Sequence, residues 1–74
     1  MLNFDLKKAL MDHEARSGHR LTYEELAQLS GVSVDTVKSI ANRNDYNTSL
    51  KTVSDISKIL GVDPTGFFIW NTDD

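Results

Sequence analysis

The hydrophobic positions of this chain fall into short segments with helical spacing, separated by polar turns. The first segment begins after a capping residue, Asn3 or Asp5, and ends near Ser17-Gly18. Its apolar face carries His13, which has no second ligand four residues later, so we expect a half-buried or surface histidine rather than a metal ligand. The residues of this face are Leu6, Ala9, Leu10 and His13.

Two short helices joined by a tight turn are predicted between residues 22 and 43. Thr22 can cap the first helix, and Glu25 three residues later completes a capping box. Gly31 lies where the chain must reverse, a position that often needs a positive φ. Ser33 can cap the second helix. The predicted buried residues are Leu26, Ala27 and Leu29 in the first helix and Val37, Ile40 and Ala41 in the second.

The spacing around Gly31 indicates a helix-turn-helix. Ala27 precedes the glycine by four residues, and a larger side chain there would hold two steeply crossing helices apart. Val37 and Ile40 follow the glycine by six and nine residues, where they can pack under the first helix.

Two further helical segments are predicted after this motif. The segment 44–48 is a turn-rich loop, Ser49 can cap a fourth helix, and Gly61 can end it. Asp63-Pro64 predicts a fifth helical turn, with a capping residue followed by proline at the first helical position. The inward positions of the fourth helix are Leu50, Val53, Ile56 and Leu60.

Four large apolar residues, Phe67 to Trp70, then follow in succession. They cannot all enter one small core, so we expect some to cover the first helix and the others to form a surface patch or a subunit interface. Residues 71–74 are expected to fray.

The composition is that of one small globular domain spanning residues 1–74, with 39% apolar and 26% charged residues. The absence of cysteine excludes disulfides and thiolate metal sites. No apolar run approaches the roughly 18 residues that a membrane span needs, and no signal-peptide pattern opens the chain, so we expect a cytoplasmic protein.

The net charge of −3 argues against strong non-specific binding to nucleic acid. The charge is unevenly distributed, however: residues 16–51 carry a balance of +1 and the remainder −4. The acidic residues therefore lie largely outside the motif.

The motif closely resembles the phage-repressor-like Xre/Cro family of DNA-binding proteins, whose usual pattern is Leu-Thr-Gln-x-x-Leu-Ala, Gly-Val-Ser and Thr-Ile-Ser-x-Ile. Tyr23 replaces the usual glutamine, which weakens any phosphate contact carried over from the family. Ala41 replaces a common glutamate and Arg43 a common glycine, which suggests a recognition helix that ends differently from the family norm. The resemblance covers most of the chain, through Leu21-Thr22-Tyr23-Glu24-Glu25-Leu26-Ala27, Gly31-Val32-Ser33, Thr36-Val37-Lys38-Ser39-Ile40, Ser49-Leu50-Lys51-Thr52-Val53 and Leu60-Gly61-Val62-Asp63-Pro64.

This resemblance implies an all-α, five-helix, lambda-repressor-like domain with its helix-turn-helix at residues 22–43. The implied function is sequence-specific regulation of transcription, as a repressor that inserts residues 33–43 into the major groove of double-stranded DNA. It implies no cofactor and no metal. Because one short helix reads few base pairs, we expect a homodimer, formed through Phe67–Trp70.

A helical wheel of the second motif helix places polar residues opposite the buried side. Asn42 can bond adenine, Lys38 can reach guanine, and Val34 can contact a thymine methyl group. Tyr23 can donate its hydroxyl to a phosphate, and Arg20 in the preceding loop either approaches the DNA backbone or is solvated. The candidate DNA-binding residues are Tyr23, Val34, Asp35, Lys38, Ser39, Asn42, Arg43, Asn44 and Asn47.

Polar residues opposite an apolar stripe occur on any surface helix, so a second hypothesis remains open. A degenerate helix-turn-helix can bind a protein partner instead of DNA, and the acidic balance and the aromatic residues near the C-terminus favour that alternative. Enzyme activity is not expected, since the chain has no Gly-rich phosphate loop, no paired histidines and no nucleophile–base set.

Overall fold

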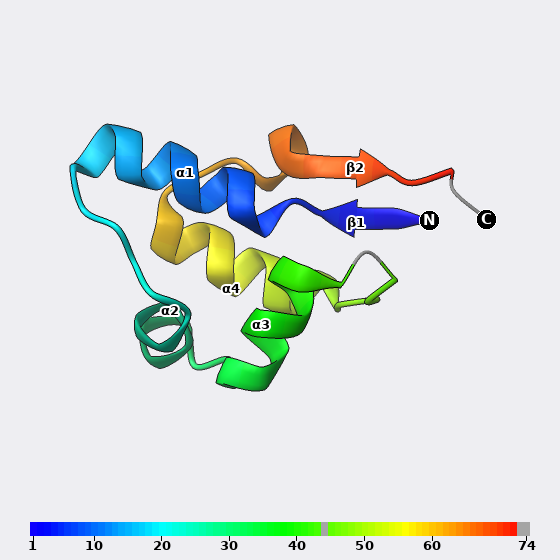
Figure 1. The fold of residues 1–74 in the computed structure, drawn as a ribbon, viewed down its shortest axis with the longest axis horizontal. Coiled ribbons are helices and arrows are strands. Elements are labelled where there is room, and N and C mark those ends of the chain that lie inside the picture. Colours follow the sequence, from blue (N-terminus) through cyan, green and yellow to red (C-terminus); the bar gives the residue numbers. More distant parts are fainter. Residues whose placement is uncertain (44, 73–74) are drawn as a thin grey trace.

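The computed structural model of the chain describes residues 1–43 and 45–72. In this part of the chain, four α-helices are preceded and followed by a short strand (Figure 1). None of these helices is long and apolar enough to cross a membrane. The elements are β1 (Leu2–Phe4), α1 (Leu6–Ser17), α2 (Tyr23–Ser30), α3 (Val34–Asn42), α4 (Leu50–Leu60), a 3₁₀ turn (Pro64–Phe67) and β2 (Phe68–Trp70).

Each α-helix begins after a polar residue whose side chain accepts a backbone hydrogen bond, as predicted. Asp5 rather than Asn3 caps α1, and its carboxylate accepts from the Lys8 amide at 3.2 Å. The capping box of α2 is complete, because the Glu25 amide donates to the Thr22 hydroxyl at 3.0 Å and the Thr22 amide donates to the Glu25 carboxylate at 2.9 Å. The caps of the other two helices are Ser33 for α3 and Ser49 for α4.

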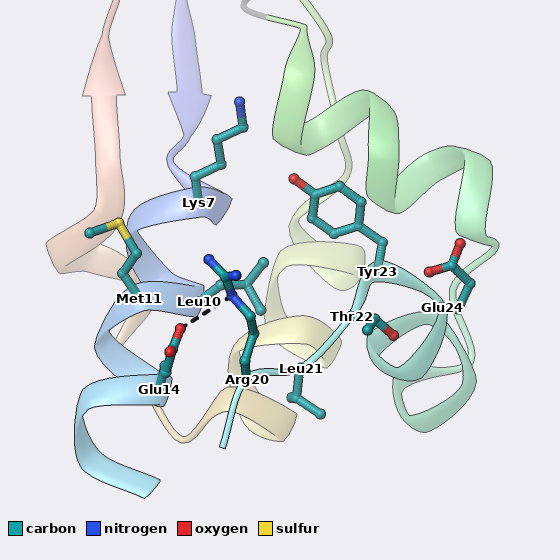
Figure 2. Close-up of a pocket in the computed structure, with 9 residues that line it drawn as sticks. All are labelled: Lys7, Leu10, Met11, Glu14, Arg20, Leu21, Thr22, Tyr23 and Glu24. Atoms are coloured by element: carbon teal, nitrogen blue, oxygen red, sulfur yellow. Dashed lines mark ion pairs between the residues drawn. The ribbon is translucent and has the colours of Figure 1, made fainter. Parts of the chain in front are cut away.

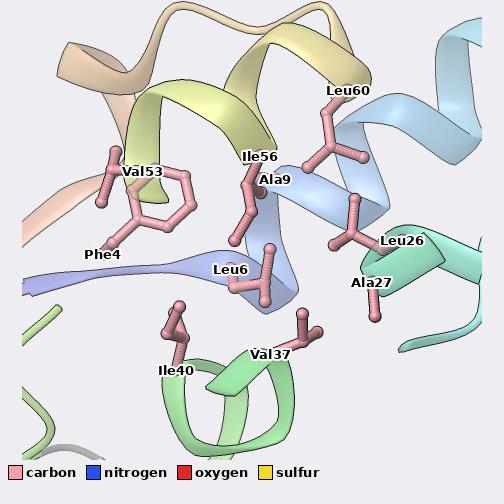
Figure 3. Packing of buried hydrophobic residues seen from close by; sticks show 10 residues of the cluster. All are labelled: Phe4, Leu6, Ala9, Leu26, Ala27, Val37, Ile40, Val53, Ile56 and Leu60. Carbon is pink, nitrogen blue, oxygen red and sulfur yellow. The ribbon is translucent and has the colours of Figure 1, made fainter. Parts of the chain in front are cut away.

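The core is a cluster of buried hydrophobic side chains from β1 and all four helices (Figure 3). Leu6 of α1, Leu26 of α2, Val37 of α3 and Ile56 of α4 are fully buried, so each helix contributes to one shared interior. The other members are Phe4, Ala9, Ala27, Ile40, Val53 and Leu60.

Two leucines predicted to be buried are exposed instead. Leu29 is 58% exposed and Leu50 is 77% exposed. Burial in α2 centres between Leu26 and Ala27, and at about 100° per residue Leu29 lies about 110° from that centre. Leu50 is the first residue of α4, ahead of the turns that pack on the core.

The fold is mostly helical, as the all-α expectation implied, but the predicted fifth helix is wrong and a small strand pair is present. Asp63 does cap a helical turn, since its carboxylate accepts from the Thr65 amide at 3.0 Å, but the turn is 3₁₀ and ends at Phe67. The chain then becomes strand β2. Aromatic and β-branched residues favour strands, and β1 provides the pairing partner that this short segment needs.

The two strands form an antiparallel pair that joins the beginning and the end of the described chain (Figure 1). The register pairs Leu2 with Trp70, Asn3 with Ile69, and Phe4 with Phe68. The rings of the last pair meet edge to face, with centroids 5.7 Å apart. Phe67 and Phe68 pack against the core, whereas Ile69 and Trp70 are exposed, which confirms the predicted division of the apolar run. Residues 73–74, part of the segment predicted to fray, lie outside the described residues.

Candidate nucleic-acid interface

The turn between α2 and α3 has the predicted helix-turn-helix geometry. Gly31 has a φ of 75°, and its amide donates to the Ala27 carbonyl at 3.0 Å, which closes α2. Ala27 is buried, as a small residue at the helix crossing should be. Leu26 of α2 and Val37 of α3 belong to the same core cluster, so the buried faces of both helices fix how α3 is presented.

One side of α3 is buried and the other faces solvent, as the helical wheel predicted. Val37 and Ile40 are in the core, and Ala41 packs partly against it. Asn44 lies outside the described residues. Of the other candidate residues, Asp35, Lys38, Asn42, Arg43 and Asn47 are exposed, and Tyr23, Val34 and Ser39 are half-buried.

The end of α3 differs from the ends of the other three α-helices. The C-caps of those helices are Gly18, Gly31 and Gly61, each in the left-handed conformation. By contrast, α3 ends at Asn42, and its C-cap Arg43 is extended, with φ −111° and ψ 124°. The position where the family commonly has glycine therefore carries an exposed guanidinium group at the end of the recognition helix.

Lys38 in α3 and Arg43 at its C-cap each form an ion pair within the chain. Lys38 Nζ lies 3.8 Å from Glu24 Oε2 on α2. Arg43 Nε donates to Asp45 Oδ1 at 3.3 Å, and the Arg43 guanidinium carbon lies 5.5 Å from the centre of the Tyr46 ring. These pairs are exposed, so each is weak and can be exchanged for another anion.

Asn42 is also engaged within its helix. Its Nδ2 donates to the Lys38 carbonyl at 3.0 Å. A side-chain amide has two N–H donors and an acceptor oxygen, so this bond still leaves one N–H and the oxygen for another partner.

The first turn of α2 carries two acids beside Tyr23. The Thr22 backbone hydrogen bond is the main reason that the pKa of Glu25 lies below its ordinary value. Desolvation comes second and raises this pKa, and the Thr22 hydroxyl and His19 lower it by smaller amounts. His19 Nε2 lies 3.9 Å from Glu25 Oε2. Acids stabilise a helix N-terminus, but the same charges repel a DNA phosphate.

Tyr23 lines a groove of about 460 Å³ between α1 and the start of α2 (Figure 2). Leu10 and Leu21 contribute apolar lining. Lys7 and Arg20 lie at this groove too, and Arg20 Nε is 3.4 Å from Glu14 Oε1. Sequence reasoning assigned no role to Lys7, because its proximity to Tyr23 depends on how α1 packs beside α2.

The acids that form ion pairs with Lys38 and Arg43 were missed for the same reason, because their proximity depends on how the chain folds. Glu24 and Asp45 were not assigned to the site, since the wheel of one helix does not show a neighbour on another helix or in a loop. The charge pattern alone, with acids on both sides of α3 in the sequence, was the available signal. In the part of the chain that the structure describes, no three His, Asp or Glu side chains are grouped to hold a metal ion.

The chain matches known proteins over the region that forms this site. Residues 13–67, from within α1 to the 3₁₀ turn, match the family described as Helix-turn-helix. Over 59 residues, the chain is 39% identical to an uncharacterised HTH-type transcriptional regulator from Methanocaldococcus jannaschii, and the match covers 80% of this chain and 88% of that protein. With the motif geometry seen here, these matches show that the chain belongs to the Xre/Cro-like helix-turn-helix family of DNA-binding proteins.

Proposed function

We propose that this protein is a sequence-specific transcriptional regulator that places α3 in the DNA major groove. The observation that supports this proposal is the exposed polar face of α3, held outward by its buried face on Val37 and Ile40. The major groove of B-DNA is about 12 Å wide and accommodates an α-helix. The relative from Methanocaldococcus jannaschii is itself described as a transcriptional regulator.

In this proposal, the middle of α3 reads base edges. Asn42 bonds adenine through its amide, Lys38 reaches guanine O6 and N7, and Val34 contacts a thymine methyl group. Ser39 adds a hydroxyl that donates or accepts. Lys38 must leave Glu24 to reach the groove, and this exchange links affinity to the acid on α2.

Residues at the two ends of the motif hold the phosphate backbone. Arg43 at the helix end exchanges Asp45 for a phosphate, and Asn44 and Asn47 extend the contact along the following loop. Tyr23 donates its hydroxyl at the start of α2, where the family has glutamine. These contacts set the register of α3 in the groove without reading sequence.

The protein acts as a repressor by occupying promoter DNA, and it does so as a two-fold dimer. One α3 reads only a few base pairs, which gives too little specificity alone. A dimer reads two half-sites separated by one DNA turn, about 34 Å. We place the dimer contact in the C-terminal apolar run Phe67–Trp70.

Alanine substitutions on DNA selected from a random pool test this function. Arg43→Ala should weaken binding to selected and scrambled DNA alike, and should lower the slope of log K against log salt by about one. Lys38→Ala and Asn42→Ala should each cost about 1–3 kcal/mol on the selected site and less on scrambled DNA. Lys58→Ala, an exposed cation on α4, is the matched control and should change neither affinity. Equal losses on both DNAs for Lys38→Ala and Asn42→Ala would overturn base readout by α3.

The internal pairing of Lys38 and Arg43 supports one alternative, a protein-interaction module with little DNA binding. A nanomolar gel shift on selected DNA favours the regulator. Co-purification of a protein partner, with no retention on any DNA, favours the alternative.

A further inference from the structure

The groove between α1 and the start of α2 has the size of a small-molecule site. Its volume is about 460 Å³, whereas the groove beside β1 has only about 160 Å³. Ligand pockets in proteins typically have volumes of about 300–1,000 Å³, with a mostly apolar lining and a few polar groups that orient the ligand. The larger groove is lined by side chains from α1, from the loop 18–22 and from the first turn of α2.

The inner lining of this groove is apolar. Leu10 and Leu21 pack partly against the core and also line the groove, so they present hydrocarbon at its base. Tyr23 adds an aromatic ring that extends from α2 towards α1 (Figure 2). Met11 of α1 lies on the other side, with 67% of its surface exposed. A thioether and an aromatic ring both make favourable contacts with a further aromatic ring placed between them.

The charged side chains at the groove favour an anion. Arg20 Nε lies 3.4 Å from Glu14 Oε1, and 82% of the Arg20 side chain is exposed, so this ion pair is weak and can be exchanged. Glu24 also lines the groove, but its carboxylate lies 3.8 Å from Lys38 Nζ on α3. Lys7 forms no ion pair among the residues that the structure describes. Both acids are therefore paired, and the Lys7 ammonium is the charge that is not compensated.

Three hydrogen-bond donors lie around the opening of the groove. They are the Lys7 ammonium from α1, the Arg20 guanidinium from the loop and the Tyr23 hydroxyl from α2 (Figure 2). Within the part of the chain that the structure describes, the Tyr23 hydroxyl has no hydrogen-bond partner. An ionised carboxylate only accepts hydrogen bonds and has two oxygens, so it can accept from several of these donors at once.

We propose that this groove binds a small aromatic carboxylate. The ring lies on the apolar base between Met11 and Tyr23, and the carboxylate accepts from Lys7 and Arg20. The two halves of the groove define this class of ligand together. An inorganic anion would leave the apolar base in contact with water, and a neutral aromatic compound would leave the Lys7 ammonium without a partner.

The same groove can control the proposed DNA contact, and this step rests on the proposed function. There, the Tyr23 hydroxyl donates to a DNA phosphate at the start of α2. A carboxylate bound beside Tyr23 accepts from the same hydroxyl and adds a negative charge that repels the phosphate. Ligand and DNA therefore weaken each other's binding, and the two effects are equal because the coupling is reciprocal.

Binding is tested on the full chain without DNA, with 2-naphthoate as the probe. We expect a dissociation constant of about 0.1–1 mM, as is typical of a ligand with few atoms. In proton–nitrogen correlation NMR spectra, the largest shifts should occur in residues 7–14 and 20–24, which enclose the groove. The neutral compound 2-naphthamide has the same ring without the charge and should bind about tenfold more weakly.

Substitutions at exposed side chains separate the two halves of the site. Lys7→Gln should weaken 2-naphthoate binding about three- to tenfold and leave 2-naphthamide binding unchanged. Lys8→Gln is the matched control, because Lys8 is the next exposed lysine of α1 and does not line the groove. Met11→Gln should weaken the binding of both compounds, since it removes the thioether contact and no charge. Thermal melts verify that all three variants are folded.

Three results would overturn the ligand site. They are no shift changes at the groove with 10 mM 2-naphthoate, equal affinities for 2-naphthoate and 2-naphthamide, and equal affinities of Lys7→Gln and Lys8→Gln for 2-naphthoate. With saturating 2-naphthoate at constant ionic strength, the affinity of the wild type for selected DNA should fall, and 2-naphthamide should not lower it. If 2-naphthoate binds as expected but DNA affinity does not change, the phosphate contact of Tyr23 is overturned and the ligand site stands.

Discussion

Lys38 Nζ on the recognition helix lies 3.8 Å from Glu24 Oε2 on the preceding helix, across the turn of the motif. In the proposed complex with DNA, a phosphate or a base edge therefore competes with the Glu24 carboxylate for this ammonium group. Because the Lys38–Glu24 pair is exposed, breaking it costs little free energy. A DNA group that is well placed for Lys38 offsets this cost, whereas a poorly placed one does not. We therefore propose that Glu24 on α2 limits non-specific binding to DNA.

We predict that Glu24→Gln tightens binding to scrambled DNA by about 1.4- to 5-fold, which corresponds to the ~0.2–1 kcal/mol typical of an exposed ion pair. The freed Lys38 should also steepen the salt dependence. Fluorescence anisotropy at two salt concentrations measures both effects. Asp55→Asn is the matched control, because it removes the same charge from an exposed ion pair with Lys51 on α4. If the two variants behave alike, the effect reflects net charge and not the release of Lys38.

The helix boundaries could be predicted from the sequence because they are set by local contacts. Thr22 and Glu25 are three residues apart, and the reciprocal bonds between them depend on little else. The same holds for Ser33 and Ser49 at the following helices. The outward face of α3 was predictable for a similar reason, since Val37 and Ile40 define the inward direction of one regular helix.

The strand pair could not be predicted in this way, because its two halves lie at opposite ends of the chain. Phe68–Trp70 is too short for its periodicity to distinguish a strand from a helical turn, and its partner Leu2–Phe4 shows no signal of its own. Pairing alone decides the conformation of both. The contacts of Lys38 and Arg43 were missed because the partner acids lie on α2 and in the loop after α3.

The motif turn yields a prediction about backbone conformation alone. Gly31 has a φ of 75°, and a Cβ added there would meet no atom within 4 Å. Gly31→Ala should therefore destabilise the fold by roughly 1–2 kcal/mol through backbone strain, without a steric clash. Gly66→Ala is the control, since that glycine also has open space but no positive φ, and it should change stability little. Urea denaturation of both variants measures the difference; equal midpoints would contradict the strained turn.

The capping box of α2 gives a pH dependence. The Thr22 backbone hydrogen bond lowers the pKa of Glu25 in the folded state from its ordinary value of 4.5, so the folded state prefers the carboxylate. That contribution is complete above the unfolded pKa and is lost as the pH falls through the folded pKa. Glu25→Gln keeps an oxygen for the Thr22 amide but does not titrate at this position. The stability of the wild type relative to this variant should be constant from pH 7 to about pH 5.5 and should fall below pH 4.5. If the free energies of unfolding of the wild type and Glu25→Gln change in parallel from pH 3 to 7, Glu25 does not contribute to the pH dependence of stability.

Asp35 differs from the other acids around α3, because no cation lies within ion-pairing distance of it among the residues that the structure describes. It is exposed in the first turn of α3, where its charge favours the helix dipole by about 0.3–1 kcal/mol. Near DNA the same charge repels phosphate, unless a cytosine N4 amino group donates to it. We predict that Asp35 contributes specificity by permitting close approach only at such a base.

Asp35→Asn should therefore cost the free protein only some tenths of a kcal/mol, since the amide loses the charge but keeps an acceptor oxygen. Its affinity for scrambled DNA should rise more than its affinity for the selected site, so the ratio between the two affinities should fall. Asp55→Asn again controls for net charge and should leave that ratio unchanged. Titrations of both variants on both DNAs at two salt concentrations give the comparison. An unchanged affinity for scrambled DNA in Asp35→Asn would mean that this carboxylate does not approach the duplex, and would favour a protein partner for this face of α3.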